Sequence, residues 1–195
     1  MSVLTSVRAA TRPLHDALER DLDMVSRLTT EPGRRQVLAA FLGIYEPAEQ
    51  ALAPLLAPLP ALDYPRRLKA PRLRADLADL GLTDGAIAAL PRSAPPHLTS
   101  AAEALGFAYV LEGATLGGRI IRRRVLAAGQ PATGLSFFDF YGAETGPRWQ
   151  TFCAVLDTPP SDQEHPGDST AAVVAGATAG FTYVRAGLLD AAIAA

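Results

Sequence analysis

The stretch SAAEALGFAYVLEGATLGGRIIRRRVLAA, residues 100–128, decides the fold. Its apolar residues recur at helical spacing from end to end, and Gly129-Gln130-Pro131 directly after it is a strong helix stop. No alternating run bounded by hairpin turns interrupts the pattern here or elsewhere. The sequence therefore predicts a long central helix in an all-α protein.

The flanking sequence predicts further helices around this one. A stripe of Val7, Leu14, Leu18, Leu22 and Val25 indicates a first amphipathic helix. The other predicted helical segments are 34–56, two short helices within 75–90 broken at Gly81 and Gly85, 147–156, and 169–193, with a loop at 157–170. We expect one helical domain over residues 1–195.

Composition narrows the class of protein. Of 195 residues, 49% are hydrophobic and 19% charged, which excludes intrinsic disorder. The single cysteine, Cys153, excludes a disulfide framework, and a net charge of −2 gives no reason to expect nucleic acid. The N-terminus lacks a signal-peptide pattern, and the most apolar run, 171–184, ends at Arg185 and reads as a buried helix. We expect a soluble cytoplasmic protein with no membrane segment.

One line of side chains on the first helix carries candidate chemistry. Arg8 precedes His15 by seven residues, while Thr11 and Glu19 lie four residues to either side of it, so all four share a line along the helix. A neutral imidazole binds iron and a guanidinium binds carboxylates, and a porphyrin needs both. A boundary histidine among surface arginines gives the same pattern, so spacing alone leaves both interpretations open.

Glycines mark the central helix. Gly106, Gly113 and Gly117 share one face, and Gly118 follows directly. Each costs a helix about 1 kcal/mol relative to alanine, so something must offset the cost. Close approach to a flat ligand and tight packing against another helix are both consistent with the pattern.

The same helix ends in a cluster of arginines at positions 119, 122, 123 and 124. Basic residues suit the negative end of a helix dipole, and they also suit a dock for an acidic redox protein. Other chemistries lack the necessary residues: no glutamate has a histidine three positions on, and neither a phosphate loop nor a dinucleotide fingerprint occurs.

Four stretches together resemble the biliverdin-producing heme oxygenases, and most closely their small bacterial members associated with bacteriophytochromes. LTSVRAATRPLHDALER (4–20) is similar to the family's first helix and GFAYVLEGATLGGRII (106–121) to its distal helix. FFDFYGAETGPRWQTF (137–152) and AGATAGFTYVRAGLLD (175–190) are similar to its last two helices.

The resemblance implies a role for each matching position. His15 would be the iron ligand with Glu19 near it, Arg8 would pair with a heme propionate, and Gly113 and Gly117 would let the distal helix bend over oxygen. The remaining matches are Thr11 on the proximal face, Tyr109 and Phe181 in the pocket wall, Gly118 beside the distal glycines, and Arg148 as a second propionate contact.

One position departs from the family pattern. Many members carry an aspartate directly after the first distal glycine, where it organises a water chain that delivers protons. Ala114 stands there in this chain, followed by Thr115, so Thr115 or another polar group must support that water if turnover is to be efficient.

The resemblance implies cleavage of heme b, both substrate and cofactor, with O2 to biliverdin, CO and Fe(II). Electrons would come from an external donor, a ferredoxin or a flavoprotein reductase, and the product would supply a bacteriophytochrome chromophore or release iron. A non-catalytic heme carrier or sensor is the alternative that Ala114 keeps open. A helical protein of this fold that has abandoned heme is a third.

Overall fold

The computed structural model describes residues 2–160 and 166–193, which contain helices and no strand, so the all-α prediction is confirmed. The α-helices are α1 (Val3–Asp21), α2 (Met24–Leu28), α3 (Glu31–Leu56), α4 (Ala70–Asp79), α5 (Asp84–Ala88), α6 (Ala101–Ala127), α7 (Thr145–Asp157) and α8 (Pro166–Ile193). Short 3-10 helices are η1 (Pro60–Leu62), η2 (Tyr64–Arg67), η3 (Phe137–Asp139) and η4 (Gly142–Glu144).

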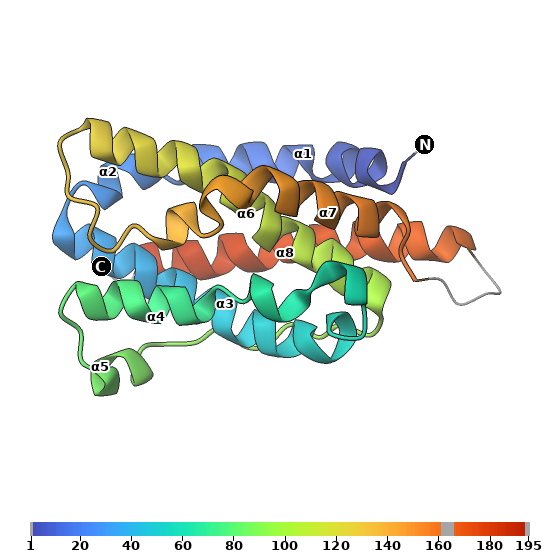
Figure 1. Cartoon of the computed structure of the whole chain (residues 1–195), viewed down its shortest axis with the longest axis horizontal. Coiled ribbons are helices and arrows are strands. Elements are labelled where there is room, and N and C mark those ends of the chain that lie inside the picture. The colour runs from blue at the N-terminus through green and yellow to red at the C-terminus, as the bar shows by residue number, and fades with distance from the viewer. Residues whose placement is uncertain (1, 161–165, 194–195) are drawn as a thin grey trace.

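Helix α8 is the support on which the other long helices pack. In Figure 1 it runs along the long axis, with α1 and α7 above it and α3, α4 and α5 below, and it contacts α1, α3 and α6. Its segment Ser169–Asp190 is long and apolar enough to span a membrane by length and composition. In this structure 39% of its most apolar window is buried, and Val173, Ala177 and Phe181 belong to the core.

Glycines allow α6 and α8 to cross in close contact. A Cβ atom on Gly106 would overlap the carbonyl oxygen of Val173, and one on Gly176 would overlap the carbonyl oxygen of Glu103. Only glycine permits this approach of two backbones. Helix packing therefore accounts for Gly106.

Several helix ends differ from the sequence prediction. Thr30 caps α3 by accepting the N–H of Gly33, so that helix starts at Glu31 and not at 34. The first amphipathic stripe is divided, since α1 ends at Asp21 and Val25 belongs to α2. Gly81 lies between α4 and α5 with φ at +87°, so it does break the helical pattern, whereas Gly85 lies inside α5 and breaks no helix.

The loop predicted over 157–170 is also too long at its C-terminal end. Helix α8 already begins at Pro166, three residues before the predicted start at 169, which agrees with the preference of proline for a first helical turn. His165, in the same predicted loop, lies outside the described residues.

A Gly106→Ala substitution should destabilise the protein by about 2–3 kcal/mol, because the added methyl has no room against Val173. Gly85→Ala is the matched control, since its Cβ would meet nothing within 4 Å and should leave stability equal or raise it by about 0.5 kcal/mol. Urea unfolding of both variants measures this. Equal stability of the two would show that the crossing does not depend on Gly106.

Candidate functional site

The imidazole of His15 is oriented by its own helix and by α8. Its side chain is 54% exposed, and its Nδ1 lies 3.8 Å from Glu19 Oε2 and 4.0 Å from Asp16 Oδ1. The ring meets Phe181 edge-on, with centroids 6.0 Å apart. Both distances are longer than a hydrogen bond, so the two carboxylates place negative charge beside Nδ1, and Nε2 is left for a ligand. Sequence reasoning found Glu19 and Phe181 but not Asp16.

Arg8 lies about two turns before His15 on α1, which packs against α7, and its guanidinium lies beside the hydroxyl of Tyr109 on α6. Burial raises the pKa of Tyr109, and the nearby Arg8 opposes that rise only in part. The Tyr109 ring in turn contacts Trp149, with centroids 5.6 Å apart. An exposed guanidinium beside a phenol is an arrangement that binds carboxylates.

One flank of α6 is apolar and uncovered. Leu116 and Ile120 are 39% and 52% exposed, unusual values for large aliphatic side chains. On the same flank a Cβ added to Gly117 would meet nothing within 4 Å, and one added to Gly113 would lie 3.7 Å from Trp149. Packing therefore accounts for Gly106 but leaves Gly117 unexplained.

Other predicted residues lie apart from this flank. Gly118 faces Phe138, whose carbonyl oxygen would be 2.8 Å from an added Cβ. Thr115 is buried on the far flank of α6 and donates its hydroxyl to the Glu112 carbonyl at 2.7 Å. Arg148 pairs with Glu144 at 3.0 Å and lies 3.8 Å from Asp63.

Thr11 is buried on α1, and its hydroxyl donates to the carbonyl of Val7 at 2.8 Å. The structure thus pairs Arg8 with Tyr109 and His15 with Phe181, and it engages the hydroxyl of Thr11 within its own helix.

The arginine cluster at the end of α6 is divided. Arg119 and Arg122 lie 3.1 and 3.6 Å from the carboxylate of Asp139. Arg123 and Arg124 are exposed, and neither pairs with a carboxylate within residues 2–160 and 166–190. Two of the four arginines are thus left for solvent or a partner.

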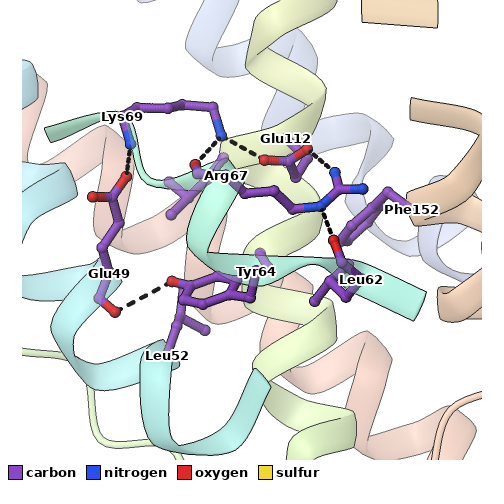
Figure 2. A pocket seen from close by; sticks show the side chains of 10 residues that line it. Glu49, Leu52, Leu62, Tyr64, Arg67, Lys69, Glu112 and Phe152 are labelled. Carbon is purple, nitrogen blue, oxygen red and sulfur yellow. Dashed lines mark hydrogen bonds and ion pairs between the residues drawn. The ribbon is translucent and has the colours of Figure 1, made fainter. Parts of the chain in front are cut away.

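A buried charge cluster behind α6 escaped sequence reasoning. Glu112, 3% exposed, accepts from Arg67 Nη1 and Lys69 Nζ at 2.5 Å each (Figure 2). It also accepts from the Tyr141 hydroxyl at 2.9 Å. The same cluster includes Glu49 and encloses a cavity of about 10 Å³. The sequence did hold a signal, an acidic residue inside the apolar run FAYVLEGATLGG.

The cluster sets the charge state of its two carboxyl groups. Burial alone would raise the pKa of Glu112, but Lys69 and Arg67 hold it below the usual value. Burial raises the pKa of Glu49, and the backbone N–H of Lys69 opposes that rise only in part. Glu112 is therefore the anion that the two cations stabilise.

Within the described residues no group of three or more His, Cys, Asp or Glu side chains could hold a metal ion. A lone histidine can still bind iron when a porphyrin supplies the other nitrogen ligands. An oriented imidazole, an arginine–tyrosine pair and an uncovered apolar flank on a glycine-containing helix fit such a group. The fold and site thus define an all-α protein of the heme-binding class.

Comparison with known proteins agrees with this class. The heme oxygenase family model matches residues 1–189. A heme oxygenase of Xanthomonas campestris pv. campestris is 34% identical over 137 residues, which cover 69% of this chain and 76% of that protein.

Solved structures share the fold at low sequence identity. The NO- and CO-bound heme oxygenase of Neisseria meningitidis has a TM-score of 0.76 at 17% identity, covering 98% of this chain and 92% of that one. The Leptospira interrogans enzyme gives 0.74 at 20% identity, with 97% and 100% covered. The heme complex of Synechocystis heme oxygenase-1 gives 0.71 at 15%, with 97% and 92% covered.

The chain belongs to the heme oxygenase family. It is an oxidoreductase of heme degradation, and biliverdin, CO and iron are the products general to that family.

The charge state of Glu112 predicts how stability depends on pH. A carboxyl whose pKa is lower in the folded than in the unfolded protein stabilises the fold above its unfolded pKa, and that contribution is lost as pH falls through the folded pKa. As the pH falls from about 5 to about 3, the free energy of unfolding should therefore fall more in the wild type than in Glu112→Gln. Glu49, with its raised pKa, acts in the opposite direction in both proteins. Parallel urea titrations measure the difference, and identical slopes would contradict it.

Proposed function

We propose that heme binds between α1 and α6, with His15 Nε2 as the axial iron ligand. The observation that carries the proposal is the pairing of an oriented, half-exposed imidazole with an uncovered apolar flank on the distal helix. The proximal side would then be closed by Phe181, and the distal side by Leu116, Ile120 and the glycines.

Arg8 and Tyr109 are the residues proposed to hold a propionate carboxylate. In the described structure the Arg8 guanidinium lies beside the Tyr109 hydroxyl. A propionate carboxylate could accept from both groups, so neither would be left without a hydrogen-bond partner. We give Arg148 no such role, because Glu144 and Asp63 already engage it.

Bound heme supplies oxygen activation, while the chain supplies orientation and access. A helix without a Cβ at Gly117 leaves room for a small molecule on the distal side. Ala114 cannot order water, and the Thr115 hydroxyl already donates to a backbone carbonyl, so neither side chain offers a free donor to the distal side. Proton delivery would then depend on solvent that enters along the exposed flank.

The electron donor is proposed to be a separate ferredoxin or flavoprotein reductase that acts in the cytoplasm. Arg123 and Arg124 are the proposed contact for its acidic surface, because they alone of the four clustered arginines keep unpaired charge within the described residues. The product would serve as a bacteriophytochrome chromophore, or the reaction would release iron.

Hemin titration followed by reduction in air tests the proposal. A Soret band should form with one equivalent of hemin and then decay into broad red absorption. His15→Ala should lose the histidine-ligated spectrum, whereas His97→Ala, which alters an exposed histidine on another surface, should retain it. A stable Soret band in the wild type would favour the heme carrier or sensor, and no Soret band at all would favour a fold that has abandoned heme.

Charge reversal tests the docking surface. In Arg123→Glu/Arg124→Glu, the KM for a ferredoxin donor should rise roughly three- to tenfold and lose part of its salt dependence. Turnover driven by ascorbate should not change, because a small reductant needs no docking surface. An unaltered KM for ferredoxin would place the donor elsewhere.

A further inference from the structure

Glu112 connects the distal helix to two remote parts of the chain. Arg67 and Lys69 lie at the end of η2 and just before α4, and Tyr141 lies between η3 and η4. All three donate to the one carboxylate, which directly precedes Gly113 (Figure 2 shows the two cations). The side chain of Glu112 thus fixes α6 at the entrance to its glycine segment.

The backbone of the same turn has further side-chain partners. The Tyr45 hydroxyl, from α3, donates to the Leu111 carbonyl at 3.3 Å, and the Thr115 hydroxyl donates to the Glu112 carbonyl at 2.7 Å. Additional donors on successive carbonyls compete with the i→i−4 bonds of the helix and favour a bend. The turn is therefore shaped by side chains as well as by its own helical bonds.

The helix needs such support just here. Gly113, Gly117 and Gly118 follow within six residues, and each weakens the helix relative to alanine. The uncovered flank lacks the neighbouring side chains that would otherwise hold the segment. Without an anchor, the position of this segment relative to α1 would be poorly defined.

A buried ion cluster is an inefficient way to gain stability. An apolar residue of the same size is often equally stabilising or better, because charges lose solvation on burial. Directional, charge-assisted hydrogen bonds instead restrict the groups that they join to a single geometry. Three donors from two segments fix both the rotation of α6 about its axis and its shift along that axis.

We propose that Glu112 is a positioning residue for heme oxygenation: held by Arg67, Lys69 and Tyr141, it sets where the Gly113–Gly117 segment lies over bound heme. Glu112 itself is 3% exposed and its carboxylate is covered by these three partners, so it would act without contacting the ligand. The inference rests on the proposed placement of heme between α1 and α6.

Glu112→Gln and Glu49→Gln form a matched pair for the test. Both change a buried glutamate of the same cluster to its neutral isostere, but Glu49 accepts from the backbone N–H groups of Lys69 and Ala70 and holds α4, not α6. In ligand-free protein, only Glu112→Gln should lose protection of the amides of residues 113–118 against hydrogen exchange, by roughly tenfold.

The same pair separates positioning from binding in the hemin complex. Glu112→Gln should slow the decay of bound heme roughly tenfold or more while its Kd for hemin stays within about threefold. Glu49→Gln should alter neither quantity by more than about threefold. Equal behaviour of the two variants in exchange and decay would overturn the proposal.

A double variant, Lys69→Met/Glu112→Gln, guards against a loss of folding. It removes one charge of each sign and leaves one cation, Arg67, and one carboxyl, Glu49, at the cavity, so stability should recover relative to Glu112→Gln. Decay of heme should remain slow if Glu112 positions α6. Recovery of both stability and rate would instead show that only charge balance matters.

Different results would contradict the proposed function and the positioning role of Glu112. If the wild type shows no Soret band, heme does not bind as proposed, yet hydrogen exchange in the two ligand-free variants still tests the positioning role. If the wild type degrades heme and Glu112→Gln does so at the same rate, only the positioning role is contradicted.

Discussion

The backbone contact between α6 and α8 is the constraint on which the site depends. Because Gly106 and Gly176 let the two helices touch, α6 is fixed on α8 near its start. Helix α8 also carries Phe181, which contacts His15 on α1. One helix thus supports both His15 and the glycine segment of α6, and the separation of the two is set by packing that involves no ligand.

Identical residues serve two purposes along α6, and spacing alone cannot distinguish them. Gly106, Gly113 and Gly117 share a face, yet Gly106 lies against the backbone of α8 and Gly117 against nothing. Helical periodicity determines the direction in which each residue lies around the helix axis, but it does not determine which neighbouring element packs against that residue. The sequence could therefore predict the face and both interpretations, while only the tertiary structure assigns each glycine to one of them.

The parts of the site that could be predicted depend on local spacing within one helix, and the parts that could not depend on tertiary contacts. The relation of His15 to Glu19 lies within one helix turn, so sequence spacing determines it. Arg67 and Lys69 lie more than forty residues from Glu112 and Tyr141 lies 29 away, on segments whose approach depends on the tertiary structure. Arg148 shows the converse, since it matches a family position but is engaged by Glu144 and Asp63.

The distal helix carries two energetic deficits in the ligand-free chain. Its glycines weaken the helical backbone, and Leu116 and Ile120 expose apolar surface to water. On the proposed placement of heme, the ligand would relieve the second deficit by covering the flank, but it would not replace the Cβ atoms that the glycines lack. The first deficit leaves the geometry of this segment weakly defined, and a constraint on its position has to come from another part of the same helix. A buried carboxylate held by two cations and a phenol supplies that constraint one residue before Gly113, and it does so without filling the open space beside Gly117.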